Sequence, residues 1–175
     1  MTSNAPTQSH KVWHKVWHLG ADVDTDALAP GAYMQHGIDV IAQHCLENLL
    51  PDFAREVKPG DIIVAGPNFG IGSSREQAAA ALVHLGVAAV VAPSYGGLFF
   101  RNAFNLGLLL LTSPDNETLQ NQELLAHVSI GLKVIFNLEK SIKTAPVPEF
   151  LLDRVRAGGL MNQLRQQYGK NAINA

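Results

Sequence analysis

The sequence predicts an α/β fold in which parallel strands are joined by helical crossovers. Three short apolar runs, at residues 61–65, 87–92 and 108–112, are typical of buried strands. Between consecutive runs lie two stretches that suit helices, residues 78–85 and 96–106. Strands that alternate with helices at this spacing form parallel sheets, because each helix carries the chain back to the start of the next strand.

Size and composition predict a single domain. A chain of 175 residues, 47% of them hydrophobic, can bury one core, so we expect one domain over residues 11–175. Residues 1–10 are polar and lack the apolar centre of a signal peptide, and we expect a disordered leader there.

No apolar run approaches the ~20 residues that a membrane span needs, which favours a cytoplasmic protein. A formal net charge of −2 argues against nucleic acid and anionic membranes as partners.

The start of the predicted domain repeats the tetrapeptide Lys-Val-Trp-His over residues 11–18. Its alternation suits a strand with both tryptophans on one face. His14 and His18 could form a metal tract, but no carboxylate stands beside them, and we expect surface positions instead. Cys45 is the only cysteine, which excludes an internal disulfide and a cluster held by several thiolates of this chain.

The second half of the chain adds shorter elements. We expect antiparallel strands at residues 126–130, 133–137 and 141–143, and helices at residues 149–157 and 160–168, which are separated by Gly158-Gly159.

The segment that joins the first apolar run to its helix reads Gly-Pro-Asn-Phe-Gly-Ile-Gly-Ser-Ser-Arg-Glu-Gln, residues 66–77. Gly66, Gly70 and Gly72 allow positive φ and a close approach of the backbone to a ligand. The first turn of the helix offers unpaired N–H groups and a positive dipole end, which attract anions. The two serines and Arg75 add hydroxyls and a planar cation that can hold a carboxylate, so we expect an anion site here.

Simpler interpretations of this segment stand beside the anion site. Ser73 with Glu76, or Ser74 with Gln77, has the spacing of a helix-capping box. Two serines in tandem weaken this alternative, because one helix needs only one cap. A nucleotide-binding phosphate loop is excluded, because the Gly-Lys-Ser/Thr ending is absent.

Asp22, Asp24 and Asp26 alternate with Val23 and Thr25. In an extended segment the three carboxylates would share one face and repel one another. A solvated turn, cationic partners or a metal could relieve the repulsion, although the glycine and the distal glutamate of a calcium loop are missing.

Two other segments are loop candidates. Residues 29–37 lie between proline and glycine breakers, and we expect a loop that leads into a helix over residues 38–48. Tyr95 and Gly96-Gly97 follow the second predicted strand, at the edge where open α/β sheets place ligands.

The complete string at residues 66–77 resembles the Asn-Phe-Gly-x-Gly-Ser-Ser-Arg-Glu signature of the small, swivelling domain of the aconitase superfamily. It is most similar to the separate small subunits of 3-isopropylmalate dehydratase and homoaconitase. Residues 22–26, 58–66, 99–108 and 148–152 also resemble the family, so the resemblance covers most of the chain. It implies a single swivelling β/β/α domain of aconitase type.

The resemblance implies half of an enzyme. The family isomerises hydroxy-di- or tricarboxylic acids by removing water and adding it back with the hydroxyl on the adjacent carbon, a step of leucine biosynthesis in one branch. A [4Fe–4S] cluster held by cysteines of a separate large subunit acts as the Lewis acid. The expected partners are therefore that large subunit, in a heterodimer, and a small carboxylic acid. No cofactor or metal is expected on this chain.

The resemblance also implies roles for particular residues. Ser73 matches the serine that abstracts a proton as an alkoxide, while Ser74 and Arg75 would bind substrate carboxylate or support the alkoxide, and Glu76 would cap or orient. The mobile loop that selects the substrate side chain would be Tyr33, Met34, Gln35 and His36. The supporting residues would be Asp24, Thr25, Asp26, Asn68, Gly70 and Gly72.

Three positions depart from the family pattern. Ile71 stands where many small subunits carry cysteine, Gln77 replaces a common histidine, and Gly97 replaces a common arginine. Loss of a cation near a polyanionic substrate suggests a different substrate or a different carboxylate clamp. The small subunit of homoaconitase or of another substituted-malate dehydratase therefore remains an alternative, and so does a non-catalytic carboxylate-binding module.

Overall fold

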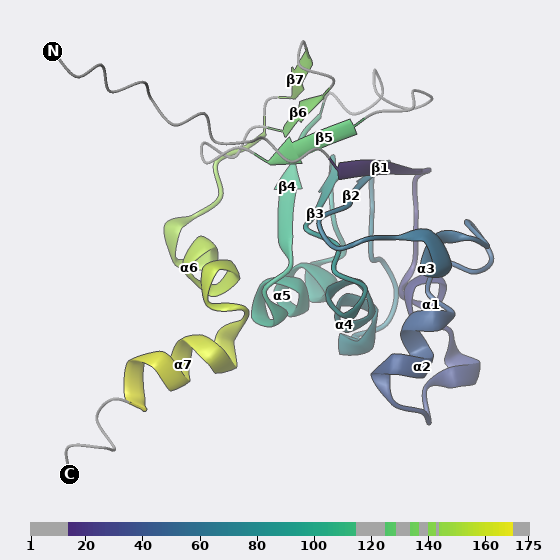
Figure 1. The fold of residues 1–175 in the computed structure, drawn as a ribbon, viewed down its shortest axis with the longest axis horizontal. Helices are drawn as coiled ribbons and strands as arrows, with labels where there is room; N and C mark the ends of the chain where they lie inside the picture. Colours follow the sequence, from purple (N-terminus) through teal and green to yellow (C-terminus); the bar gives the residue numbers. More distant parts are fainter. Residues whose placement is uncertain (1–13, 115–124, 129–133, 137–139, 143, 170–175) are drawn as a thin grey trace, which may run out of the picture.

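The computed structural model describes residues 14–114, 125–128, 134–136, 140–142 and 144–169 (Figure 1). The expected leader, residues 1–10, and the first tryptophan of the repeat lie outside these residues. The described strands form one sheet in the order β4-β3-β2-β1-β5-β6-β7. They are β1 (His14–Leu19), β2 (Ile62–Ala65), β3 (Ala89–Ala92), β4 (Leu109–Thr112), β5 (Leu125–Val128), β6 (Val134–Phe136) and β7 (Lys140–Ile142).

The sheet has a parallel half and an antiparallel half. β1 to β4 pair in parallel, as the alternation of strands and helices predicts. β5 pairs antiparallel with β1, and β6 and β7 continue the antiparallel half. Because β1 borders both halves, it is the strand that joins them (Figure 1).

The helices gather beside the parallel strands. α4 and α5 lie side by side, with the α1–α2 segment next to α4 and the pair α6–α7 next to α5 (Figure 1). The helices are α1 (Thr25–Leu28), a 3₁₀ turn η1 (Gly31–Tyr33), α2 (Ile38–Gln43), α3 (Phe53–Glu56), α4 (Glu76–His84), α5 (Gly97–Leu106), α6 (Glu149–Ala157) and α7 (Leu160–Tyr168).

Most predicted elements are confirmed, and two helices differ in length. α6 and α7 have the predicted bounds, and Gly158 between them adopts the left-handed conformation of a helix end. α4 begins at Glu76, two residues before the predicted start. α2 ends at Gln43 rather than continuing to residue 48. The physical reason is Leu46, which is fully buried with a φ of 62° and donates its N–H to Ala27 O at 2.8 Å.

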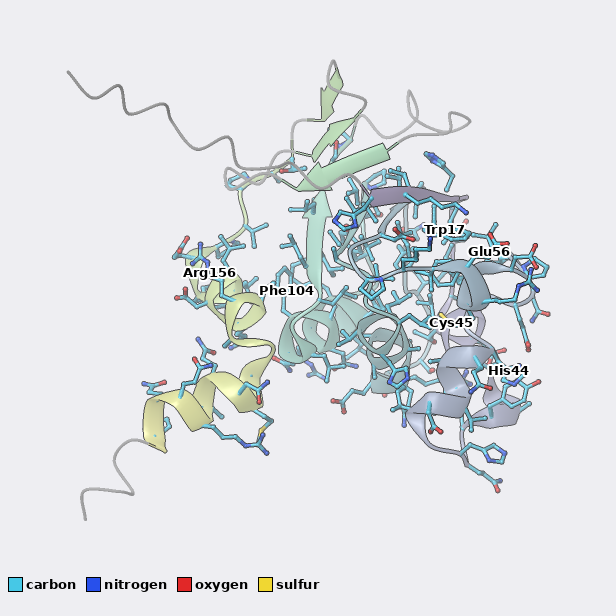
Figure 2. All side chains as sticks on the ribbon, in the orientation of Figure 1. Trp17, His44, Cys45, Glu56, Phe104 and Arg156 are labelled. Atoms are coloured by element: carbon cyan, nitrogen blue, oxygen red, sulfur yellow. The ribbon has the colours of Figure 1, made fainter. Side chains whose placement is uncertain are left out.

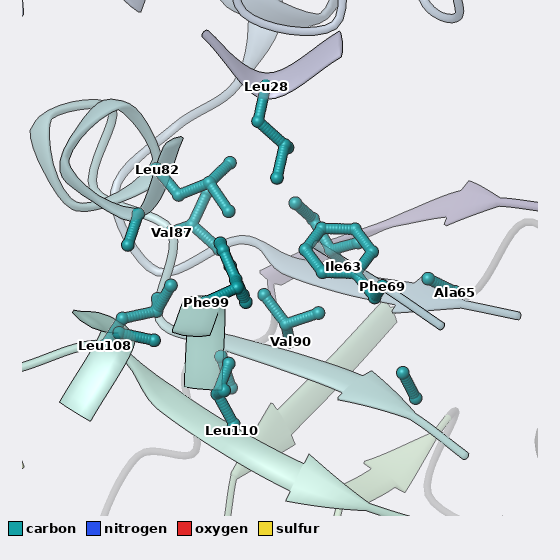
Figure 3. Close-up of a cluster of buried hydrophobic side chains, with 14 of the residues drawn as sticks. Leu28, Ile63, Ala65, Phe69, Leu82, Val87, Val90, Phe99, Leu108 and Leu110 are labelled. Carbon is teal, nitrogen blue, oxygen red and sulfur yellow. The ribbon is translucent and has the colours of Figure 1, made fainter. Parts of the chain in front are cut away.

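The core lies between the parallel strands and the helices, and its centre is shown in Figure 3. β2 and β3 are buried along their whole length, which is typical of central parallel strands. Phe69 and Phe99 meet edge to face at a centroid distance of 5.4 Å. Phe69 therefore packs the loop after β2 onto α5.

One buried carboxylate joins β1 to β2 at the start of both strands. Asp61 is 3% exposed. It accepts hydrogen bonds from Lys15 N at 3.1 Å, Trp17 Nε1 at 3.0 Å and Lys58 N at 3.0 Å. Trp17, the described tryptophan of the repeat, is thus held by its indole nitrogen and packs edge to face on Phe53 at 5.0 Å. A buried charge is tolerated here because three donors surround it.

The single cysteine is also buried. Cys45 is 1% exposed and lies just after α2, within the group of short helices α1, α2 and α3 (Figure 2). Burial raises the pKa of its thiol, so the thiolate that a metal or cluster requires is disfavoured.

Gly70 carries a testable consequence of this packing. Its φ is +73°, and a Cβ at this position would lie 2.2 Å from Phe99 Cγ. We expect Gly70→Ala to lower the free energy of unfolding by about 2–3 kcal/mol, because left-handed backbone strain adds to the clash. Urea unfolding of both variants measures this effect, with Gly20→Ala as the control, since a Cβ at Gly20 meets nothing within 4 Å. Equal urea midpoints for the two variants would contradict the packing described here.

Candidate active site

Three loops meet at the carboxyl ends of the parallel strands, where open α/β sheets place their ligands. The signature loop, residues 66–75, follows β2 and lies between the loops that follow β1 and β3. An isolated parallel bridge joins Asp24 to Ile71, and another joins Phe69 to Tyr95. Backbone hydrogen bonds reinforce both contacts, from Thr25 N to Ile71 O at 2.8 Å and from Gly96 N to Phe69 O at 2.9 Å. The pairing of the sheet thus continues into the loops and holds them together.

Asn68 is the side chain that connects all three loops. Its Nδ2 donates to Asp22 Oδ1 at 2.8 Å, and its backbone N–H donates to Ser94 Oγ at 2.9 Å. Ser94 Oγ in turn donates to Asn68 Oδ1 at 3.2 Å. Asn68 and Asp22 both adopt positive φ, 63° and 58°. Non-glycine residues hold such a backbone only where the surroundings compensate for the strain, so Asn68 has a structural role in the signature loop.

Two of the three signature glycines have the predicted positive φ. Gly70 and Gly72 have φ of +73° and +108°. The prediction for Gly66 was wrong, because its φ is not in the left-handed region. A Cβ at Gly66 would lie 2.6 Å from Ala21 N, so this glycine is required by the close approach of the loop after β1.

Residues 22–26 do not form the extended segment in which three carboxylates would share one face, and a cationic partner, one of the expected ways to relieve their repulsion, is present at Asp26. Thr25 begins α1, and Asp24 caps this helix by accepting from Ala27 N at 2.7 Å. Asp22 binds Asn68, and Asp26 binds Arg75. Each carboxylate therefore has its own donor, and this pairing relieves the repulsion that an extended segment would impose.

The capping-box alternative for the two serines is also wrong. Arg75 occupies the N-cap position of α4, and no side-chain cap bond is made. Ser73 lies two residues earlier and contacts Thr25: the two hydroxyl oxygens are 3.1 Å apart, and Ser73 N donates to Thr25 Oγ1 at 3.1 Å. Ser73 and Ser74 are both exposed, and Ser74 O accepts from Asn102 Nδ2 at 3.4 Å. Ser73 thus projects from the loop with its hydroxyl held from one side.

Arg75 is oriented by groups from the loop after β1. Its Nη1 donates to Asp26 Oδ1 and to Ala29 O, the latter at 3.0 Å, and its side chain is 27% exposed. Asp26 also accepts from Gly31 N at 3.1 Å. The hydrogen bond from Arg75, and then that from Gly31, holds the pKa of Asp26 below its ordinary value of 3.8. A lowered carboxyl pKa keeps the pair ionised at neutral pH, and the pair is lost only as the pH falls through that lowered pKa.

The predicted selectivity loop divides into an anchored end and a free end. The Tyr33 ring stacks on His44 with centroids 3.6 Å apart and an interplanar angle of 9°, and His44 Nδ1 lies 2.6 Å from Glu47 Oε2. Met34 is half-buried, whereas Gln35 and His36 are exposed. Within this loop, His36 borders a cavity that Tyr33 does not line.

This cavity lies between α2 and the first turns of α4 and has a volume of about 280 Å³. Its walls are part polar and part aliphatic: His36, Ile38, Ile41, Glu76, Gln77 and Ala80. Half-buried Ile38 and Ala80 were not among the predicted site residues, because apolar helix positions are expected to face the core, as Ile41 does at 1% exposure. Gln77, one of the departures from the family pattern, also lines this cavity.

In the third loop, the Tyr95 hydroxyl is engaged by backbone carbonyls and is not presented to a ligand. The Tyr95 hydroxyl lies 2.9 Å from Val90 O and 2.8 Å from Leu111 O, and burial raises its pKa. It therefore ties β3 to β4. Gly97 begins α5 and is exposed, and a Cβ there would meet nothing within 4 Å, so the surface at this departure from the family pattern is open.

The described part of the chain contains neither a metal centre nor a membrane-spanning helix. Among those residues, no three His, Cys, Asp or Glu side chains come together in a way that could hold a metal ion. None of the described helices has the length and apolar character to cross a membrane.

Comparison with known proteins identifies the family. The sequence model of the family named aconitase C-terminal domain matches residues 27–116. The small subunit of 3-isopropylmalate dehydratase from Aliarcobacter butzleri is 39% identical over 94% of this chain and 98% of its own. Small subunit 1 of the same enzyme from Thermotoga maritima is 39% identical over 89% of this chain and 93% of its own.

A solved structure agrees with these relatives. The crystal structure of 3-isopropylmalate dehydratase from Methanocaldococcus jannaschii superimposes with a TM-score of 0.84 and 34% identity, and the match covers 93% of this chain and 98% of that one. The same family is indicated by the signature loop, by its position on the sheet and by the similarity along nearly the whole chain. The chain belongs to the aconitase C-terminal domain family, among the small subunits of 3-isopropylmalate dehydratase.

Proposed function

We propose that this chain is the small subunit of a hydro-lyase of the 3-isopropylmalate dehydratase type, which moves a hydroxyl between adjacent carbons of a substituted malate in leucine biosynthesis. One observation carries the proposal: exposed Ser73 and oriented Arg75 stand together on a rigid loop in a chain similar to such subunits over nearly its whole length.

The activity requires a large subunit in a hetero-oligomer. A [4Fe–4S] cluster on that partner supplies the Lewis acid that weakens the bond to the leaving hydroxyl. The single cysteine of this chain is fully buried with a raised thiol pKa, so it is a poor ligand for such a cluster. The chain therefore contributes the base and the carboxylate clamp rather than the cofactor.

Ser73 is the proposed base, which takes the proton from the carbon α to a substrate carboxylate. A serine hydroxyl is a very weak acid, so its alkoxide needs nearby donors and cations in a site closed to water. The N–H groups at the start of α4 and the Arg75 guanidinium are the nearest such groups along the chain. Glu76, in the first turn of α4, orients rather than catalyses.

Ser74 and Arg75 are the proposed carboxylate ligands. Because Nη1 of Arg75 is held by Asp26 and Ala29 O, the rest of the guanidinium is presented in one orientation and can form a bidentate pair. Asp26 supports the clamp by aiming Arg75. The other supporting residues fix the loops: Asp24, Thr25, Asn68, Gly70 and Gly72.

Substrate choice is proposed to depend on the free end of the selectivity loop. Met34, Gln35 and His36 follow the anchored Tyr33, and His36 meets Gln77 at the cavity of about 280 Å³. Half-buried Ile38 gives this cavity an apolar wall that suits an aliphatic substituent. Gln77 and the open surface at Gly97, where the family pattern has cationic side chains, favour as the second candidate a malate with a different uncharged substituent.

The first prediction concerns the partner. Anaerobic reconstitution of the isolated chain with iron and sulfide should give no stoichiometric cluster and no dehydratase activity, because its one thiol is buried. Adding a reconstituted large subunit should give both. The measurements are iron and sulfide content, and turnover of 2- and 3-isopropylmalate. A stoichiometric cluster on the isolated chain would contradict the proposal that the large subunit alone holds it.

The second prediction concerns Ser73 and Arg75 in the complex. Ser73→Ala and Ser73→Gly should both remove most of kcat, because the lost group acts only on the way to the transition state. Arg75→Lys keeps the charge but loses the bidentate geometry, so KM should rise alongside a fall in kcat.

Steady-state kinetics in both directions test this prediction, with a thermal melt as the stability control. Near-normal kcat for Ser73→Ala, alongside unchanged substrate affinity for Arg75→Lys, would favour the non-catalytic carboxylate-binding module instead.

The third prediction separates the two ends of the selectivity loop. His36→Ala should change the ratio of kcat/KM between isopropylmalate and homologues with smaller or larger substituents, with little change in melting temperature, since His36 is exposed. Tyr33→Ala should instead lower the melting temperature, because it removes the stack on His44. This assignment would be contradicted if Tyr33→Ala changed the substrate preference and His36→Ala did not.

A further inference from the structure

We infer that Thr25 is a positioning residue for Ser73: its buried hydroxyl donates a hydrogen bond to Ser73 Oγ, so that the proton of Ser73 points away from the loop. The inference rests on the proposed function, because it concerns how the proposed base is prepared. It starts from two contacts. Thr25 Oγ1 lies 3.1 Å from Ser73 Oγ and 3.1 Å from Ser73 N, whose N–H it accepts.

The direction of the hydroxyl hydrogen bond follows from burial. Only one proton can lie between two hydroxyl oxygens. Thr25 is 2% exposed, and among the described residues Ser73 Oγ is the one acceptor within hydrogen-bond distance of its hydroxyl. A buried donor without an acceptor is costly, whereas exposed Ser73 can give its own proton to water or to a ligand. Thr25 is therefore the donor.

The backbone fixes this geometry. Thr25 is the first residue of α1, and its N–H donates to Ile71 O at 2.8 Å, two residues before Ser73. Its β-branched side chain has few rotamers. Gly72 has a φ of +108°, and a Cβ there would lie 3.0 Å from Thr25 Oγ1. The glycine thus gives the threonine hydroxyl room beside the loop.

This arrangement suits the proposed chemistry. A donor already aimed at Ser73 Oγ needs no reorganisation when that oxygen becomes an alkoxide, and the hydrogen bond strengthens as the charge develops. When the alkoxide forms, the outward proton of exposed Ser73 passes to solvent water, and a ligand at that side then meets the lone pairs of the oxygen. Thr25 stabilises the base without contacting substrate.

The test uses the complex of the full chain with its large subunit. Thr25→Val removes the hydroxyl at nearly constant volume, and Thr25→Ser keeps it. Ser94→Ala is the matched control, because it removes a hydroxyl that holds the same loop through Asn68 without contacting Ser73. For each variant we would measure kcat, KM, the pH profile of kcat and the melting temperature.

We expect Thr25→Val to lower kcat by about 100-fold, as for loss of one donor to an oxyanion, with KM little changed. The apparent pKa at which its kcat increases with pH should be higher, because the alkoxide has lost a donor. Thr25→Ser should restore both values, and Ser94→Ala should leave the pH profile in place.

Two results would overturn the inference. In the first, Thr25→Val keeps kcat within about threefold of the unmodified complex although Ser73→Ala is inactive. Ser73 would then still be the base, but Thr25 would not position it. The other is a Ser94→Ala loss equal to that of Thr25→Val at equal melting temperature, with no movement of either pH profile. If Ser73→Ala keeps its turnover, the proposed function fails, and the role of Thr25 fails with it.

Discussion

The register between β1 and β2 is the constraint on which the candidate site depends. Buried Asp61 fixes the start of the two strands by accepting from the backbone of Lys15 and the indole of Trp17. Parallel pairing then carries this register to Leu19 and Ala65, where both strands end. The loops that follow continue the pairing as far as Asp24 and Ile71. A shift of one residue would separate Thr25 from Ser73 and Asp26 from Arg75, so the site inherits its precision from the sheet.

Much of this architecture could be predicted from the sequence. Short apolar runs and the helices between them predicted the parallel strands, because local pattern decides such elements. The complete string from Asn68 to Glu76 predicted where polar groups gather. What could not be predicted depended on contacts distant in sequence. The shape of residues 22–26 is decided by Asn68 and Arg75, more than forty positions away, and no local pattern encodes those partners.

The serines illustrate the limit most clearly. The spacing of Ser73 and Glu76 suited a capping box, yet α4 begins with no side-chain cap. Its first turn forms next to α5, and the carbonyl of Ser74 instead accepts from Asn102. The Ser73 hydroxyl faces Thr25 rather than the first turn of α4, so a tertiary contact replaces the predicted cap. The cavity beside His36 was missed for a related reason: nothing in the pattern of α2 tells a core-facing isoleucine from one that lines a hollow.

The stack of Tyr33 on His44 has a consequence for how such a protein can change over evolutionary time. It fixes the start of the loop through an aromatic stack and a hydrogen bond within residues 33–47. Exposed Gln35 and His36 can then vary with little cost in folding, since their side chains make none of the anchoring contacts. If this loop selects substrate as proposed, new substrate ranges become accessible by substitutions in one short exposed stretch, while the signature loop and its support stay under separate selection.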